Sequence, residues 1–158
     1  MKRFFLFAIS VSLLAMSACV SNGSKQNTSN QIEWSEPKYS IGDIVVIGNE
    51  MGVVFDVTTD GQHGKAMSVS QTRCSWESAR SWCRKFGSGW RLPSISELKI
   101  ISNKRDVLDS TLVANGYKKV WGCLWSSSYA EYVHVGNGHA GIDYYKDGHN
   151  YVRAVSAF

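Results

Sequence analysis

Helical periodicity in this chain is confined to one central stretch, residues 75–116, and strand-like sequence lies on both sides of it. Inside the stretch, apolar residues recur at three- and four-residue spacing, which marks helices with one buried face. On either side, β-branched runs are separated by turns rich in glycine, asparagine and aspartate. The order of strands, helices and strands predicts an α+β fold, with two to three helices inserted between the N- and C-terminal strands of one antiparallel sheet.

Capping residues mark where the helices should begin. Ser75 can cap one helix, and Ser94 with Glu97 forms the reciprocal pattern known as a capping box. Gly116 is well placed to end the last helix. The expected helices cover residues 76–86, 95–103 and 107–115.

The expected strands form two groups separated by these helices. The first group comprises a hairpin and one further strand, at residues 43–47, 52–57 and 65–70. The second group comprises residues 125–128, 131–135, 140–145 and 151–158. Core residues expected in the second group are Val133, Val135, Ile142, Val152 and Val155. Structural roles are also expected for Trp76, Trp82, Trp90, Leu92, Leu98 and Trp121.

The N-terminal segment is typical of a targeting signal. Basic residues precede a short apolar run, and the stretch from Met16 to Cys19 resembles a bacterial lipobox, whose cysteine is lipidated. We expect a lipoprotein signal peptide at residues 1–18 and a lipid on Cys19; the alternative is an ordinary signal with a chance cysteine. Val20 stands where some lipoproteins of the inner membrane carry aspartate. A surface-exposed, outer-membrane lipoprotein of the bacterial cell envelope is therefore the expectation.

Residues 20–31 are polar and contain no aromatic side chain, so residues 19–38 are expected to be a flexible tether before a single domain at 39–158. Without the signal, 15 basic and 13 acidic side chains remain, a net charge of +2 instead of the +4 of the whole chain. This small excess gives no reason to expect a nucleic-acid partner.

Three cysteines remain besides Cys19, an odd number for an oxidising compartment. Cys74 and Cys83 flank most of one expected helix, and nine helical residues rise about 13 Å, too far for a disulfide. A disulfide would therefore join Cys123 to Cys74 or to Cys83. Three unpaired thiols are the alternative.

Histidines and aspartates gather late in the sequence, where they could ligate a metal. The spacing of His134, His139 and His149 with Asp143 and Asp147 matches no metal-binding pattern, so no metal and no other cofactor is expected. The chain also lacks a recognisable set of nucleophile and base, so we expect no enzymatic activity.

Tyrosine and histidine are concentrated after Trp125, a segment with five of the seven tyrosines and three of the four histidines. Small polar residues fill the gaps, the composition of many recognition surfaces. Strand alternation places Tyr132 and His134 opposite the inward Val133. The alternative is an ordinary sheet rich in tyrosine. The expected ligand-binding surface comprises Tyr129, Tyr132, His134, His139, Asp143, Tyr145, His149 and Asn150.

Several motifs resemble the Lcl C-terminal family, named after a bacterial collagen-like adhesin. They are Trp82-Cys83, the run from Gly89 to Ser94, Glu97-Leu98, the run from Trp125 to Ser128, and the run from Tyr151 to Val155. The resemblance covers about residues 70–158. It implies a fold similar to C-type lectins and formylglycine-generating enzymes. Arg91 and Arg153 belong to these motifs and are expected to be buried or semi-buried hydrogen-bonding residues.

The resemblance also implies a function in binding, because members are commonly exported lipoproteins or surface modules. Some relatives are variable proteins of diversity-generating retroelements, in which the stretch after Trp-Ser-Ser is rewritten. Two family features are missing here. Ala154 stands where many members have a cysteine that can pair with the Cys83 position, and the calcium-binding triplets of sugar-binding lectins are absent. A copper oxidase site needs two adjacent reactive cysteines late in the chain, where only Cys123 lies.

Two functions are consistent with these observations. The first is a lipid-anchored, C-type-lectin-like module that recognises an extracellular protein or glycan through its C-terminal surface. The second is adhesion to a polyanion such as a glycosaminoglycan, which should weaken steeply with salt. The basic residues for the second function would be Arg73, Arg80, Arg84, Lys85, Lys118 and Lys119.

Overall fold

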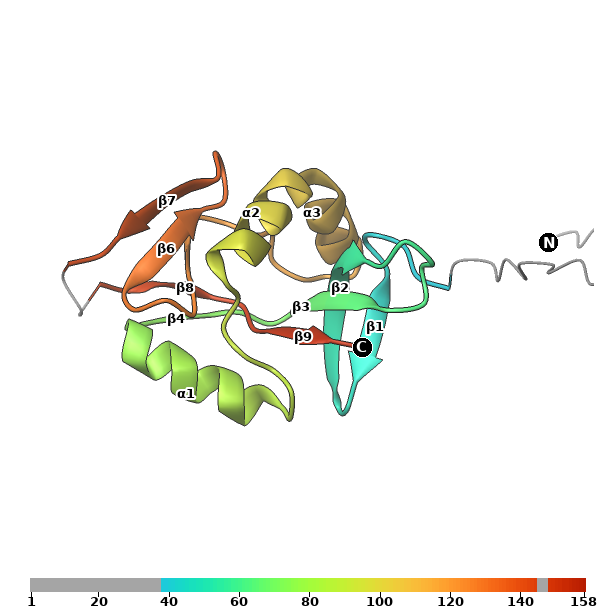
Figure 1. Cartoon of the computed structure of the whole chain (residues 1–158), viewed down its shortest axis with the longest axis horizontal. Coiled ribbons are helices and arrows are strands. Elements are labelled where there is room, and N and C mark those ends of the chain that lie inside the picture. The colour runs from blue at the N-terminus through green and yellow to red at the C-terminus, as the bar shows by residue number, and fades with distance from the viewer. Residues whose placement is uncertain (1–37, 145–147) are drawn as a thin grey trace, which may run out of the picture. The chain divides into compact units, whose positions relative to one another are not determined.

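A computed structural model describes residues 38–144 and 148–158, which belong to the unit Trp34–Phe158. The described residues form an α+β domain with three helices and two sheets. Figure 1 shows α2 and α3 on one side of the strands and α1 on the opposite side. In the part of the chain that the structure describes, no helix has the length and apolarity needed to span a membrane.

The first sheet, here called sheet A, has the strand order β1-β2-β3-β9 and is antiparallel throughout. Sheet B has the order β4-β8-β5-β6-β7, and all its pairs are antiparallel except β5 with β8. The strands of sheet A are β1 (Ile44–Ile47), β2 (Glu50–Val57), β3 (Gly64–Ser68) and β9 (Val155–Ala157). Those of sheet B are β4 (Thr72–Cys74), β5 (Cys123–Trp125), β6 (Glu131–His134), β7 (His139–Ile142) and β8 (Asn150–Val152).

The predicted α+β fold with helices inserted between strands is confirmed, but its strands form two sheets instead of one, because two extended runs of chain cross together from one sheet to the other. One run supplies β3 and β4, and its partner, expected as the single strand 151–158, supplies β8 and β9. At the crossing, Ala154 N donates to Ser68 Oγ at 3.0 Å, and Ser68 N donates to Ala154 O at 2.8 Å. These bonds satisfy backbone and side-chain groups where the regular strand pairing is interrupted.

The buried guanidinium of Arg153 fills this crossing point. Its Nη1 donates to the carbonyls of Ser68 and Val69 at 2.8 and 3.0 Å. Its Nη2 donates to the side-chain oxygen of Gln71 at 3.0 Å and to the carbonyl of Lys118 at 2.6 Å. Arg153 is 1 % exposed, which confirms the expectation of a buried hydrogen-bonding arginine. It ties the crossing strands to the segment that enters β5.

All three expected helices are present: α1 covers Trp76–Phe86, α2 covers Ile95–Asn103 and α3 covers Arg105–Ala114. The first two begin at their predicted capping residues, whereas α3 begins before the expected residue 107 and has no side-chain cap. The Ser75 side chain accepts from Ser78 N. At α2, Glu97 N donates to Ser94 Oγ at 3.2 Å and Ser94 N donates to Glu97 Oε2 at 2.8 Å, so the capping box is confirmed. These local bonds fix the helix starts without help from the rest of the fold.

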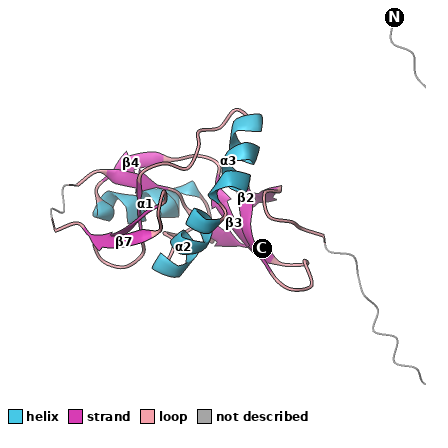
Figure 2. Ribbon diagram, turned by 90° about the horizontal axis from the view of Figure 1, so that it is seen from above, coloured by secondary structure: helices cyan, strands magenta, loops and turns pink. Residues whose placement is uncertain are grey.

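Two apolar clusters lie on opposite faces of sheet B. One contains Leu124 and Val133 with residues of α2, α3 and sheet A, and the other contains Trp125 and Val152 with residues of α1. Figure 2 gives the same arrangement from above, with α3 over β2 and β3. Sheet B is therefore covered by helices on both faces, which holds the β5–β6 pair firmly in place.

The structural role expected for the tryptophans is confirmed for two of them and wrong for one. Trp76 and Trp90 are buried in the apolar cluster beside α1, and Trp82 is half-buried and packs against the same cluster. Trp121 is 68 % exposed, because it lies in the loop before β5 and no helix covers it. Trp125 is fully buried instead, and its Nε1 donates to the carbonyl of Cys74 at 2.8 Å.

Candidate ligand-binding surface

The β6–β7 hairpin carries the centre of the predicted surface. Its register pairs Tyr132 with Gly141 and His134 with His139, so these four residues share one face. Val133 is fully buried on the other face, which confirms the predicted alternation. His134 and His139 are both exposed.

A tight turn joins the two histidines; we call His134, Asn137 and His139 the histidine turn. The Asn137 side-chain oxygen accepts from His139 N at 3.0 Å and lies 3.2 Å from His134 Nδ1. Gly138 N also donates to the His134 carbonyl at 2.9 Å. These contacts fix the backbone of the turn and the imidazole ring of His134.

Tyr132 is less accessible than the other predicted residues, because α1 covers its face of the sheet. It is half-buried and packs against the α1 cluster, with its ring 6.4 Å from that of Trp125. A Cβ atom on Gly141 would lie 2.7 Å from the Tyr132 ring, so only glycine fits opposite it. Tyr132 therefore has a packing role whatever else it contacts.

An exposed apolar group lies at the opposite end of the hairpin, and we call its members, Tyr129, Ile142 and Tyr144, the apolar edge. They are 56, 48 and 84 % exposed. Asp143 N donates to the Ala130 carbonyl at 2.8 Å. Because Ala130 follows Tyr129 and Asp143 precedes Tyr144, this bond brings the backbone at the two tyrosines close together. The Tyr129 ring lies 5.0 Å from the buried ring of Trp76 in an edge-on arrangement.

Sequence reasoning missed two of these three residues. Ile142 was expected in the core, and its exposure shows that this expectation is wrong. It pairs with Glu131 at the end of edge strand β7, beyond the apolar clusters. Tyr144 belongs to the counted tyrosines, but nothing in the local pattern distinguished it from the others.

Asp143 and Asn150 close the connection between β7 and β8. Asn150 Nδ2 donates to Asp143 Oδ2 at 3.5 Å, and a Cβ on Gly148 would overlap the same carboxylate. His149 is exposed, and its carbonyl accepts from Arg73 Nε at 2.6 Å. Tyr145, the remaining predicted contact, lies outside the described residues.

The predicted surface is thus divided along one strand. The histidine turn and the apolar edge lie at opposite ends of β6, a separation of about 10 Å for three residues of strand. A ligand larger than one side chain could contact both ends, whereas a small molecule would contact one.

The three cysteines in the part of the chain that the structure describes, Cys74, Cys83 and Cys123, are unpaired thiols, so neither of the possible disulfides is formed. Burial, with a smaller contribution from Cys74, raises the pKa of Cys83 to about 12. Burial also raises the pKa of Cys74 and of Cys123, with Asp143 adding to the effect at Cys123. None of these pKa shifts favours the reactive thiolate. Among residues 38–144 and 148–158, no group of three or more histidine, cysteine or acidic residues is placed to hold a metal ion.

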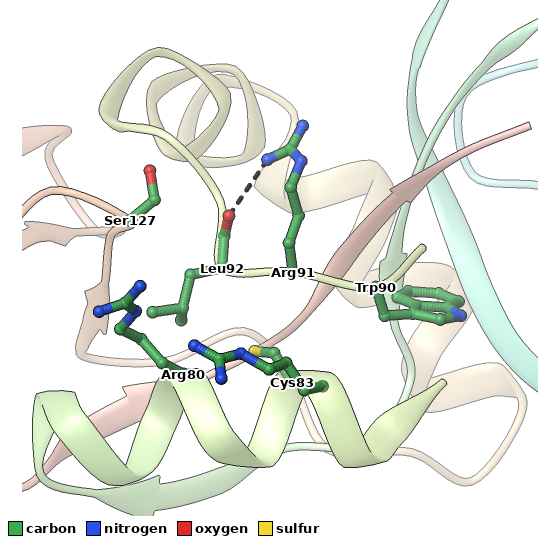
Figure 3. Close-up of a pocket in the computed structure, with 7 residues that line it drawn as sticks. Arg80, Cys83, Trp90, Arg91, Leu92 and Ser127 are labelled. Carbon is green, nitrogen blue, oxygen red and sulfur yellow. Dashed lines mark hydrogen bonds between the residues drawn. The ribbon is translucent and has the colours of Figure 1, made fainter. Parts of the chain in front are cut away.

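A separate pocket of about 430 Å³ lies between α1 and the segment that leads into α2 (Figure 3). Arg80 and Arg84 of α1 line it, and Arg91 lies across from them. Arg91 forms two hydrogen bonds with Glu97, at 2.7 and 2.8 Å, and its side chain is 52 % exposed. The expectation for Arg91 is thus confirmed in its hydrogen bonding but not in burial.

The other basic residues of the polyanion hypothesis lie in different surroundings. Arg73 is held by His149 and lies over the ring of Tyr151. Lys119 lines a hollow on α3 together with Arg105, Asp106 and Asp109. The structure therefore places two of the six residues, Arg80 and Arg84, in a common pocket, while Lys119 lies beside two carboxylates.

Comparison with known proteins assigns this chain to a family. The Lcl C-terminal domain matches residues 26–156, so the match begins well before the motifs that first suggested it. A comparison with curated proteins gives no match. Since the matched region includes the hairpin of sheet A, all three helices and the proposed surface, the chain belongs to the Lcl C-terminal domain family.

Proposed function

We propose that this chain is a cell-envelope lipoprotein whose Lcl C-terminal domain binds an extracellular protein or glycan. The apolar edge provides the main contact and the histidine turn a second one. The observation that carries the proposal is the exposure of Tyr129, Ile142 and Tyr144 at one end of a hydrogen-bonded hairpin.

Physical chemistry favours binding as the role of this edge. Large apolar side chains gathered on a surface commonly mark an interaction site, because their contact with water is unfavourable. Tyrosine supplies a large contact area with little loss of side-chain freedom. The backbone beneath is ordered by the Asp143–Ala130 hydrogen bond and by the close packing of Tyr132 on Gly141. A ligand would therefore meet side chains that are already positioned.

Binding is proposed in preference to catalysis because the polar groups of the surface serve to order loops. Asn137 holds the histidine turn, and Asp143 is bonded to Asn150. We also propose a C-type-lectin-like fold, supported by the family and by the helices inserted between strands. Superposition of an experimental structure on C-type lectins would test it.

The ligand-binding proposal is tested by screening the purified chain against glycan and extracellular-protein arrays. Any ligand found is then measured with Tyr129→Ala/Tyr144→Ala. We expect affinity to fall at least tenfold, while the free energy of unfolding changes by less than about 0.5 kcal/mol for each exposed substitution. The matched control is Val107→Ala/Val113→Ala, which removes two similarly exposed apolar side chains from α3. Equal affinity of the tyrosine variant and the control would exclude the apolar edge.

Diversification of this surface is a further part of the proposal. The stretch after Trp125-Ser126-Ser127 contains the apolar edge and the histidine turn, so rewriting the codons of these exposed residues would change ligand contacts more than packing. The test is the neighbouring DNA. A reverse transcriptase gene with a near-copy of codons 125–158 would support diversification, and its absence there would contradict it.

A further inference from the structure

The pocket beside α1 contains two arginines without acidic partners. Arg80 and Arg84 are four residues apart, so they lie on the same side of the helix. Both line the pocket of about 430 Å³ together with Leu92 and Ser127. Among the described residues, no carboxylate lies within ion-pair distance of either guanidinium.

The Glu97 carboxylate, which belongs to the family motifs, is already bound by other groups. Glu97 accepts two hydrogen bonds from Arg91 and one from Ser94 N, and it is 5 % exposed. The third arginine is directed toward it: Figure 3 shows the Arg91 side chain extending away from α1, with one nitrogen bonded to the Leu92 carbonyl. Glu97 therefore neutralises Arg91 and leaves the charges of Arg80 and Arg84 uncompensated.

The two guanidinium groups supply hydrogen-bond donors to the pocket. Guanidinium groups only donate, and a serine hydroxyl can donate as well. Two neighbouring positive charges repel each other, and an anion placed between them would remove that repulsion. Guanidinium groups also match the geometry of carboxylate, sulfate and phosphate oxygens.

The pocket is connected to the apolar edge through a row of side chains. The Arg80 guanidinium lies 5.3 Å from the ring centre of Trp76, and the Trp76 ring lies 5.0 Å from that of Tyr129. Stacking on Trp76 restrains Arg80, so the guanidinium is partly positioned before any anion arrives.

We propose that Arg80, Arg84 and Ser127 bind one oxyanionic group, a carboxylate, sulfate or phosphate, on the ligand that contacts the apolar edge. The inference rests on the proposed function for the identity of that ligand. The affinity of the pocket for a free oxyanion does not rest on the proposed function, because this chain supplies all the hydrogen-bond donors.

The test uses the full-length chain purified in detergent. Sodium sulfate, phosphate and acetate are titrated separately at constant ionic strength, adjusted with chloride, while NMR signals of the arginine side chains and of the Ser127 amide are followed. We expect saturable shifts at Arg80, Arg84 and Ser127. Stronger binding of acetate would identify a planar carboxylate as the preferred group, and stronger binding of sulfate or phosphate a tetrahedral one.

Variants separate the pocket from general charge. Arg80→Gln/Arg84→Gln should weaken the tightest of the three anions at least tenfold. Lys85→Gln/Lys118→Gln removes the same two charges from exposed positions outside the pocket and should change its affinity less than twofold. Shifts that do not saturate in the wild type, or equal losses in both variants, would overturn the proposal. Tyr144→Ala changes the apolar edge but not the row formed by Arg80, Trp76 and Tyr129, so its anion titration should match that of the wild type. A failure of the proposed function can then be told apart from a failure of this inference.

Discussion

Arg153 and Arg91 both belong to the family motifs, but they stabilise the domain in different ways. Arg153 is buried and donates to neutral oxygens of two chain segments, residues 68–71 and Lys118. Arg91 is half-exposed and forms an ion pair with a buried carboxylate. Burial lowers the pKa of Arg153 to about 10, partly offset by Asp109, whereas the hydrogen bonds to Glu97 raise the pKa of Arg91. A buried charge can thus be held mainly by the dipoles of several carbonyl groups, with a carboxylate contributing only at longer range.

The largest effect is expected at Arg153. Arg153→Met keeps an apolar stem but leaves the carbonyls of Ser68, Val69 and Lys118 without a donor inside the protein. Each unsatisfied buried group costs about 1–3 kcal/mol, so the free energy of unfolding should fall by at least about 3 kcal/mol. Urea unfolding measures this loss.

Arg153→Lys sharpens the comparison. Lysine keeps the charge but lacks the fork that reaches both Ser68 and Lys118, so it should restore only part of the stability. A methionine variant within about 1 kcal/mol of the wild type would show that the crossing point does not depend on this side chain.

A smaller effect is expected at Glu97, and it should depend on pH. The Arg91 hydrogen bond, helped by the Ser94 amide and by the charges of Arg91 and Lys65, outweighs burial and lowers the pKa of Glu97 from 4.5 to about 2. Because the folded-state pKa is lowered, the stabilisation is complete above about pH 4.5 and is lost as the pH falls toward 2. Glu97→Gln should cost about 1.5–3 kcal/mol at pH 7, the usual range for hydrogen bonds to charged groups.

The control for this prediction is the pH dependence itself. Unfolding at pH 7 and pH 3 should show a smaller loss of stability on acidification for Glu97→Gln than for the wild type. Combining it with Arg91→Met should be less than additive, because both substitutions break one ion pair. An additive double variant would contradict the pairing.

Ser94→Ala should have a still smaller effect. It removes the acceptor for Glu97 N but leaves the ion pair with Arg91 in place. We expect a loss of about 1 kcal/mol, measured by thermal or urea unfolding. Ser81→Ala, which changes an exposed serine inside α1, serves as the control. If the two serine variants melt at the same temperature, the cap contributes nothing measurable.

Cys19→Ala should leave the stability of the folded domain unchanged and alter only where the protein is found. If Cys19 carries the lipid, the variant should enter the soluble fraction or remain unprocessed, as read by fatty-acid labelling and cell fractionation. Ser21→Ala, which lies outside the lipobox-like segment, should behave as the wild type. Normal lipid labelling of Cys19→Ala would reject the anchor. This residue lies outside the part of the chain that the structure describes.

Sequence reasoning succeeded where structure is determined by near neighbours. Ser94 and Glu97 are three residues apart, and their capping box could be recognised and is present. The alternation that buries Val133 and exposes His134 is equally local. In both cases the chain needs no knowledge of distant residues to adopt the predicted conformation.

Sequence reasoning failed where contacts with distant residues determine the local structure. The interruption between β8 and β9 depends on Arg153 meeting Ser68, a partner 85 positions earlier in the chain. Ile142 is apolar and alternates correctly, but no element covers its end of edge strand β7. Tyr132 is partly covered because α1 packs on its face of the sheet. None of these neighbours can be read from a single strand pattern.

The crossing of the two extended runs also determines the order in which the domain can assemble. Ala154 bonds to Ser68, 86 positions earlier in the chain, and the same run supplies a strand to each sheet. Neither sheet can be completed before this run has been synthesised, since β9 is the edge strand beside β3 and β8 joins β4 to β5. Such non-local pairing slows folding, because a long loop must close before its contacts form. If the chain is exported, as proposed above, this delay would keep it unfolded, and so able to pass through a secretion channel, until most of its length has been made.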